Sequence, residues 1–268
     1  MLRHPFRVLF RLLYFVGGCG FDWCRSLRAP KGEGEFPWRA EWLRTSSAAA
    51  LARIGFGLPE IPAVPPVDLI VCNHLSYLDI PVISSRIASA FVSKAEVRKW
   101  PLMGAMATAG GTVYVRRERR GDVFSAAEAI HARAKAGVPV VIFPEGTSSG
   151  GAEVLPFHSS LLDPAAKGRW RVLPMAIAYE VEGGDASEEV CYWKDMTFFP
   201  HFLNLLSKRK VVVRIKVGEP VLAGSDRKAL TEMLHRRVSQ LHAELLGKAA
   251  ELDSGAPRPG LARIETIG

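Results

Sequence analysis

From residue 67 onward, short apolar runs alternate with segments of helical character, and this alternation most constrains the fold. Val67–Cys72 and Val138–Phe143 are apolar runs rich in β-branched residues, which is typical of buried strands. Further strands are predicted at residues 90–93, 112–115, 171–179, 190–193 and 210–217, and helices at residues 79–88, 100–109, 122–136, 157–166 and 227–248. The sequence therefore predicts an α/β fold with a mixed, largely parallel sheet flanked by helices.

The N-terminal segment has a different character and is predicted to form two helices. Arg3, Arg7 and Arg11 lie there among large apolar side chains. The apolar run at residues 12–16 is much shorter than the roughly 20 residues that span a bilayer, and Arg11 interrupts what a secretory signal would keep unbroken. We expect an interfacial helix on a membrane surface, with a core helix of a soluble protein as the alternative. Residues 36–56 are predicted to form the second helix, and Pro37 suits its first turn.

These differences divide the chain into three predicted parts. Residues 1–58 form a membrane-associated pair of helices, residues 59–252 the α/β domain, and residues 253–268 a flexible tail. The proline-rich stretch at residues 59–66 marks the first boundary. A chain of 268 residues is long enough for one large domain and such an appendage.

The formal net charge of +8 predicts an anionic partner. The sequence shows no motif of a nucleic-acid-binding module, so we expect no nucleic acid and favour an anionic membrane surface or a phosphorylated substrate. The four cysteines, Cys19, Cys24, Cys72 and Cys191, lack the spacing of zinc ligands. The sequence therefore predicts no metal site.

Asn73, His74 and Asp79 directly follow the first predicted strand of the α/β domain. Five residues along a helix correspond to a rotation of about 500°, which would place His74 and Asp79 on different faces. They can meet only if His74 lies in the loop and Asp79 begins the next helix. Asp79 would then accept a hydrogen bond from one imidazole nitrogen and leave the other free as a base. A helix-capping aspartate beside a loop histidine is the structural alternative.

Residues 146–150, with the sequence GTSSG, suggest a different chemistry. They match G-x-S-x-G, the nucleophile elbow of serine hydrolases, with Ser148 as the nucleophile. Such a serine should lie in a tight turn from strand to helix, but four residues separate it from the predicted strand end at Phe143. A histidine–aspartate pair without a protein nucleophile instead suits a reaction in which the substrate supplies the hydroxyl. A serine esterase that uses Ser148 stays open as an alternative.

Four blocks in order resemble the glycerolipid acyltransferases typified by lysophosphatidic acid acyltransferase. They are N-H-x4-D at residues 73–79, G-x-x-[FY/L]-x-x-R at residues 111–117, F-P-E-G-[TS] at residues 143–147, and an apolar stretch with proline at residues 172–174. The resemblance extends over residues 67–220. It implies that His74 is the general base and that Asp79 orients it.

The resemblance assigns the remaining block residues to substrate binding. They are Asn73, Gly111, Arg117, Glu145, Gly146, Thr147 and Pro174. Arg117 would contact an anionic head group, because a guanidinium offers a fixed fork of donors to phosphate. Glu145 and Gly146 would form the floor of the acceptor pocket, and Pro174 would position the acyl-donor side.

The activity implied by the resemblance is transfer of a fatty acyl group from acyl-CoA or acyl-carrier protein to a lysolipid hydroxyl, with no further cofactor. The main expected reaction converts 1-acylglycerol-3-phosphate to phosphatidic acid. The implied location is the cytoplasmic face of the cell membrane, as a peripheral, monotopic protein. An inactive lipid-binding protein is a further alternative.

One departure from the family pattern concerns the acceptor. Many lysophosphatidic acid enzymes read E-G-T-R-S, whereas Ser148 stands here in the place of that arginine. The stretches at residues 154–162 and 192–206 resemble the branch that acylates lyso-ornithine lipids. A lyso-ornithine lipid or another lysolipid is therefore the alternative acceptor.

Overall fold

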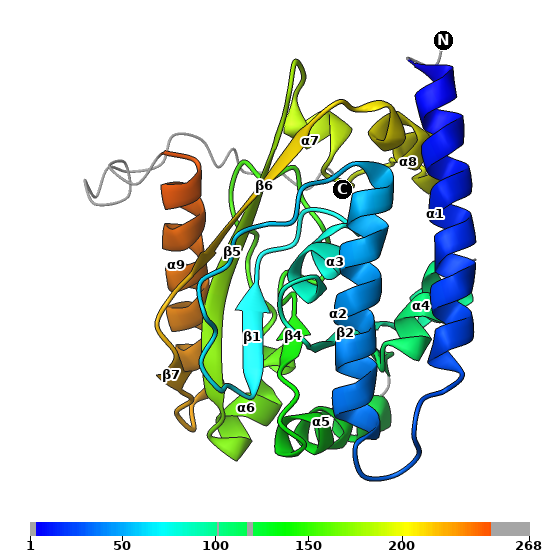
Figure 1. Ribbon diagram of the computed structural model, residues 1–268. Coiled ribbons are helices and arrows are strands. Elements are labelled where there is room, and N and C mark those ends of the chain that lie inside the picture. The colour runs from blue at the N-terminus through cyan, green and yellow to red at the C-terminus, as the bar shows by residue number, and fades with distance from the viewer. Residues whose placement is uncertain (1–3, 101, 117–119, 248–268) are drawn as a thin grey trace, which may run out of the picture.

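The computed structural model describes residues 4–100, 102–116 and 120–247 (Figure 1). Its sheet has the strand order β3-β2-β4-β1-β5-β6, and β7 also pairs with β5. The strands are β1 (Leu69–Cys72), β2 (Ala90–Lys94), β3 (Val113–Val115), β4 (Val140–Ile142), β5 (Arg171–Val181), β6 (Val211–Val217) and β7 (Val221–Leu222). The strands from β1 to β5 pair in parallel, whereas β6 and β7 run antiparallel to β5. This confirms the mixed, largely parallel sheet.

Helices surround this sheet on both faces. They are α1 (Pro5–Ser26), α2 (Glu35–Ile54), α3 (Asp79–Ser84), α4 (Met103–Ala109), α5 (Arg120–Lys135), α6 (Asp163–Gly168), α7 (Ala186–Glu189), α8 (Phe198–Ser207) and α9 (Arg227–Leu245), with short 3-10 turns η1 (Ala95–Lys99) and η2 (Ser159–Leu161). Figure 1 shows α1 and α2 side by side on one flank, with α9 on the opposite flank.

Successive residues of the central strands belong to two separate cores, as the two-residue period of a strand requires. Ile70 and Cys72 of β1 pack into the core shared with α1, α2, α3 and α8. Leu69 and Val71 pack into the core shared with α5, α6 and α9. Both faces of the sheet are therefore covered, which explains why its strands are continuous apolar runs rather than alternating ones.

The N-terminal helices are joined to the rest of the molecule by arginine side chains. Arg7 donates to the carbonyl of Ser207 at 3.1 Å, and Arg11 donates to the carbonyls of Leu206 at 3.0 Å and Lys208 at 2.7 Å. These carbonyls lie at the C-terminal end of α8, where cations are favoured. We expected Arg7 and Arg11 on an interfacial helix, among apolar side chains. Their guanidinium groups instead bind backbone carbonyls of the protein.

A buried carboxylate joins α1 to α2. Asp22 is 2% exposed and pairs with Arg53 of α2 at 2.7 Å and with Arg25 at 3.2 Å. The indole of Trp42 donates to the backbone carbonyl of Asp22 at 2.9 Å.

Within the described ranges, no helix combines the length and the apolar character needed to cross a membrane.

Two expectations for the second half of the chain are wrong. Residues 190–193 form no strand, because Val190 closes α7 and the amide of Tyr192 donates to the carbonyl of Leu75 at 2.8 Å. The helix predicted at residues 157–166 is divided into η2 and α6, and Pro164 lies in the first turn of α6. Short apolar runs do not distinguish strands from irregular segments, which accounts for the first error.

Candidate active site

The candidate site lies where β1 ends and α3 begins. The side-chain amide of Asn73 donates to the carbonyl of Ile177 at 3.0 Å and accepts from the backbone N–H of Ile177 at 2.8 Å. These two bonds join the end of β1 to β5. His74 follows in the loop, and Asp79 is the first residue of α3. This is the arrangement that the five-residue spacing required. The carboxyl ends of parallel strands are also where open α/β sheets bind their ligands.

His74 and Asp79 form a hydrogen-bonded pair. Nδ1 of His74 lies 2.7 Å from Oδ2 of Asp79. Because an ionised carboxylate only accepts, the neutral imidazole carries its proton on Nδ1 and has a lone pair on Nε2. The His74 ring stacks on Phe143, with ring centroids 4.2 Å apart and planes 16° apart. Its orientation is therefore fixed by a hydrogen bond at one edge and by an aromatic face.

Asp79 is completely buried and has a full set of donors. Oδ2 accepts from Nδ1 of His74 and from the amides of Leu75 at 2.7 Å and Ser76 at 3.0 Å. Oδ1 accepts from the hydroxyl of Tyr179 at 2.6 Å. Four donors compensate for the loss of water around a buried carboxylate. Asp79 is thus held rigidly beneath the histidine.

Glu145 connects the loop after β4 to the loop of His74. Its Oε1 accepts from the amide of His74 at 2.6 Å, and its Oε2 accepts from the amide of Leu155 at 2.8 Å. Glu145 is 3% exposed, and this burial raises its pKa to about 7, although the two amide hydrogen bonds act in the opposite direction. The next residue, Gly146, has a φ of 73°, a conformation that favours glycine.

An apolar cavity of about 330 Å3 begins at His74 and extends beneath the N-terminal helices. Helices α1 to α4 and the ends of β2, β3 and β4 contribute its walls. Its lining includes Phe15, Leu43, Ala50, Met103, Phe143 and Tyr192. A long apolar space with a base at one end suits a fatty chain whose reactive end lies at the histidine.

The other residues predicted from the sequence lie in different parts of the structure. Gly146 and Thr147 line the cavity beside His74. Gly111 has a φ of 78° and accepts two hydrogen bonds from Arg133, at 3.0 and 2.8 Å, in the turn before β3. Pro174 is buried within β5, opposite Val71 of β1. Arg117 lies outside the described residues.

Ser148 lines the cavity, but its hydroxyl is directed toward the protein backbone. It donates to the carbonyl of Tyr192, whose own amide donates to the carbonyl of Leu75. The amide of Ser149 donates to the carbonyl of His74 at 3.0 Å. The GTSSG segment thus organises the loop around His74, and no helix follows the serine as a nucleophile elbow would require.

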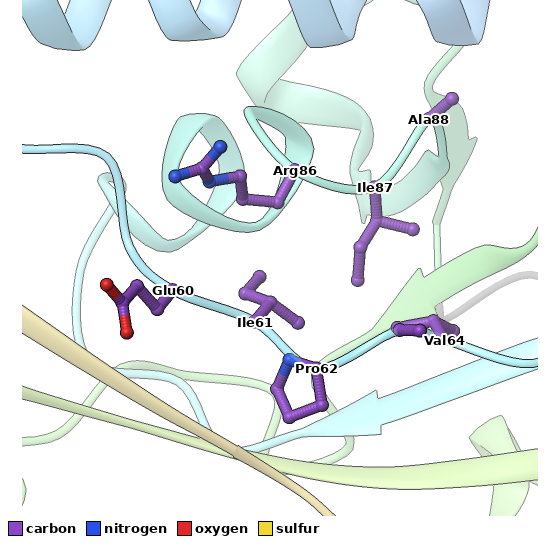
Figure 2. A pocket seen from close by; sticks show the side chains of 8 residues that line it. Glu60, Ile61, Pro62, Val64, Arg86, Ile87 and Ala88 are labelled. Carbon is purple, nitrogen blue, oxygen red and sulfur yellow. The ribbon is translucent and has the colours of Figure 1, made fainter.

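A second cavity, of about 500 Å3, lies between the linker after α2 and the turn after α3 (Figure 2). Glu60 and Arg86 are its ionisable residues, and Arg86 donates to the carbonyl of Pro59 at 2.6 Å. Its lining contains none of the candidate site residues predicted from the sequence. In the part of the chain that the structure describes, no cluster of three or more histidine, cysteine, aspartate or glutamate residues could hold a metal ion.

Several contacts of the site were not predicted from the sequence. Tyr179, which binds Asp79, appeared only as one residue of a predicted strand, and Phe143 appeared as a strand end. Tyr77, in the loop between His74 and Asp79, lines the cavity and bonds to His201 of α8 at 3.0 Å. These pairs are 100 and 124 residues apart in the chain, so no local pattern could reveal them.

The sequence and the fold both match known proteins. A family model of acyltransferases matches residues 61–178. Lyso-ornithine lipid O-acyltransferase of Brucella abortus is 37% identical over 195 residues, which cover 67% of this chain and 73% of the relative. 1-Acyl-sn-glycerol-3-phosphate acyltransferase of Neisseria gonorrhoeae is 28% identical over 200 residues, 73% of this chain and 78% of the relative.

A solved structure resembles the whole architecture. The crystal structure of the 1-acyl-sn-glycerophosphate acyltransferase PlsC from Thermotoga maritima aligns with a TM-score of 0.62 and 24% identity, and the alignment covers 94% of this chain and 97% of that one. At that identity the likeness supports the fold. It includes the N-terminal helices as well as the sheet.

The fold and the site together define a class: an α/β enzyme that transfers acyl groups, with a histidine–aspartate pair at the end of a parallel strand. The motifs and the curated relatives make the assignment narrower. This chain belongs to the acyltransferase family that includes the lyso-ornithine lipid and 1-acyl-sn-glycerol-3-phosphate acyltransferases.

Proposed function

We propose that this enzyme transfers a fatty acyl group from an acyl thioester to the hydroxyl of a lysolipid, with His74 as the general base. The observation that carries the proposal is the placement of His74. Its Nδ1 is 2.7 Å from the buried Asp79, and its ring lines an apolar cavity of about 330 Å3. One imidazole nitrogen is therefore fixed, and the other is available at the place where a fatty chain would end.

In the proposed mechanism, Nε2 of His74 removes the proton from the acceptor hydroxyl. The oxygen attacks the thioester carbonyl carbon, and a tetrahedral intermediate forms. The carbon–sulfur bond then breaks, and the imidazolium returns its proton to the leaving thiolate. The products are the acylated lipid and a free thiol. Asp79 stabilises the imidazolium while it exists and preserves the tautomer that leaves Nε2 unprotonated.

The acceptor has two candidate classes. The relatives include 1-acyl-sn-glycerol-3-phosphate acyltransferases, which supports lysophosphatidic acid as the acceptor. Two observations favour a lyso-ornithine lipid, whose head group has a carboxylate and an amine but no phosphate. Ser148 stands where many phosphate-binding relatives have arginine, and the relatives from Brucella abortus and Pseudomonas aeruginosa, at 37% and 33% identity, are lyso-ornithine lipid O-acyltransferases.

Membrane association is the third part of the proposal. Most of the exposed large apolar side chains among the described residues lie on α1, including Phe6, Phe10 and Leu13, which are 88%, 68% and 65% exposed. An exposed apolar face of this size supports shallow insertion into a bilayer. A peripheral position at the cytoplasmic face would bring the cavity under α1 and α2 close to lysolipids.

The test is release of free thiol by the purified, full-length protein in the presence of lipid vesicles. Acyl-CoA and acyl-carrier protein serve as separate donors, and lysophosphatidic acid, lyso-ornithine lipid and lysophosphatidylethanolamine as separate acceptors. We expect thiol release that requires a lysolipid and yields the diacyl product. Hydrolysis of the donor without an acceptor would instead support an esterase, and no reaction with any pair would support a protein that only binds lipid.

A further inference from the structure

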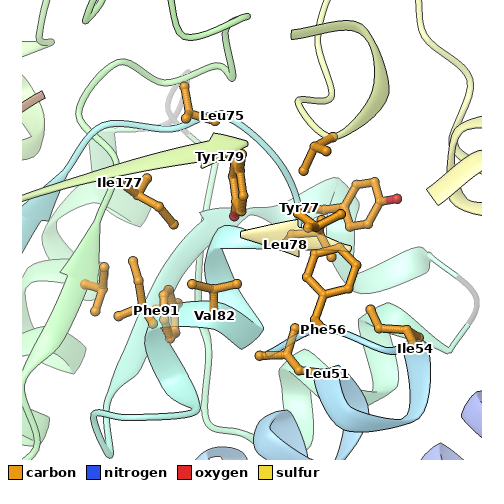
Figure 3. Packing of buried hydrophobic residues seen from close by; sticks show 14 of the residues in the cluster. Leu51, Ile54, Phe56, Leu75, Tyr77, Leu78, Val82, Phe91, Ile177 and Tyr179 are labelled. Carbon is orange, nitrogen blue, oxygen red and sulfur yellow. The ribbon is translucent and has the colours of Figure 1, made fainter. Parts of the chain in front are cut away.

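Tyr179 is a buried tyrosine whose hydroxyl points at the active-site carboxylate. It lies on β5, is 6% exposed, and donates to Oδ1 of Asp79 at 2.6 Å. Figure 3 shows its ring above α3, among apolar side chains of the core that include Val82 and Ile177. A hydroxyl in such surroundings needs a partner, and Asp79 is the partner it has.

The division of donors between the two oxygens of Asp79 gives this contact its importance. Oδ2 accepts from the His74 ring and from the amides of Leu75 and Ser76. The other oxygen, Oδ1, accepts from the hydroxyl of Tyr179. Rotation of the carboxylate would break the bond to His74, and Tyr179 opposes that rotation because it holds the far oxygen.

The Tyr179 hydroxyl also remains protonated, and therefore a hydrogen-bond donor, at neutral pH. Burial, together with the negative charge of Asp79, keeps the pKa of the Tyr179 phenol well above its usual value. The ionisable groups around Asp79 come from several elements: His74, Cys72, Glu145, Tyr179 and Cys191. Burial raises the pKa values of both thiols and raises the pKa of Glu145 to about 7.

We propose that Tyr179 is a positioning residue for the acyl transfer, which holds Asp79 so that its other oxygen fixes and tunes the base His74. The inference rests on the function proposed above. A hydrogen bond to Oδ1 withdraws charge from the carboxylate, and this weakens the attraction between Asp79 and the imidazolium. Tyr179 therefore keeps Asp79, and through it the His74 ring, in the orientation that proton transfer needs.

The test is Tyr179→Phe in the full-length enzyme, which removes the hydroxyl and leaves the ring in the core. Hydrogen bonds to charged groups are among the stronger ones in proteins, so we expect kcat to fall roughly 10- to 100-fold while KM for both substrates stays within about twofold. The acid limb of the pH profile of kcat/KM should move to higher pH, because Asp79 then carries more negative charge next to the imidazolium. Thr231→Val is the matched control, because it removes a buried hydroxyl of α9 that donates to the carbonyl of Arg227 at 2.6 Å, away from Asp79.

The outcomes separate this inference from the function on which it rests. A fall in kcat with a shifted acid limb in Tyr179→Phe, and neither change in Thr231→Val, supports the inference. An unchanged acid limb contradicts the inference, whether kcat is retained or falls together with the melting temperature. Tyr179 would then contribute only to the packing of the core. If the wild-type protein itself releases no thiol with any lysolipid, the proposed function fails first.

Discussion

The carboxylate of Glu145 accepts a hydrogen bond from the backbone amide of His74 at 2.6 Å, so the loop after β4 is joined to the loop that carries the proposed base. The resemblance had assigned Glu145 to the floor of the acceptor pocket. In the structure the side chain is 3% exposed and both of its oxygens accept backbone amides. This contact joins two sequence motifs that are 71 residues apart into one rigid unit.

The buried position of Glu145 predicts a pH-dependent stability. Its pKa is raised from 4.5 to about 7. The folded state therefore binds a proton more tightly than the unfolded state, and the associated stability is complete below about pH 4.5 and is lost as the pH rises through 7. The loss amounts to about 3 kcal/mol for a shift of this size. Glu145→Gln should remove this part of the pH dependence.

Urea unfolding of both proteins between pH 4.5 and 8 measures this difference directly. The free energy of unfolding of the wild type should fall relative to Glu145→Gln across that range. Glu153 is exposed in the loop that follows Glu145, so Glu153→Gln is the control. Its free energy of unfolding should depend on pH in the same way as that of the wild type. Parallel curves for wild type and Glu145→Gln would show that Glu145 titrates at an ordinary pKa.

The exposed face of α1 predicts how the protein binds membranes. Phe10→Ser and Leu13→Ser together should weaken binding to anionic vesicles about 100-fold or more, because each buried side chain contributes on the order of 1.5–3 kcal/mol. The melting temperature should stay the same, since both side chains are exposed in the free protein. Leu222→Ser on β7, where the leucine is 61% exposed, is the control. Equal loss of vesicle binding in the control would mean that α1 is not the binding surface.

The cavity beneath α2 predicts a limit on acyl-chain length. Ala50 lines the cavity and its neighbour Ala49 does not. Ala50→Leu should lower kcat/KM for long-chain donors more than for short-chain donors, at about 0.8 kcal/mol for each methylene that no longer fits. A series of acyl donors of increasing length, compared among wild type, Ala50→Leu and Ala49→Leu, provides the measurement. The same length preference in all three proteins would place the acyl chain elsewhere.

Local sequence patterns were sufficient for the central part of the fold. Runs of β-branched residues marked β1 and β4, and the spacing of His74 and Asp79 required the loop and helix start that the structure has. Pro37 correctly indicated a helix near residue 36, and α2 begins at Glu35. These features depend on neighbours within a few residues, so a single sequence contains the information.

The remaining features depend on contacts that are distant in the chain. Arg7 and Arg11 appear in the sequence as cations among apolar residues, yet they bind backbone carbonyls at the end of α8, about 200 residues away. Tyr179 has no motif of its own, and its role depends on the pairing of β5 with β1. The sequence therefore located His74, Asp79 and Glu145, but not Tyr179, which donates to Asp79.

The most direct test of the central claim is the initial rate of lysolipid-dependent thiol release by wild type, His74→Ala and Ser148→Ala. His131→Ala is the control, because His131 stacks on Trp170 in the part of the molecule that packs on the opposite face of the sheet. Loss of a positioned general base should lower kcat by roughly 100-fold or more in His74→Ala, with most activity kept in Ser148→Ala and His131→Ala. An active His74→Ala protein together with an inactive Ser148→Ala protein would contradict the proposed mechanism and favour a serine nucleophile.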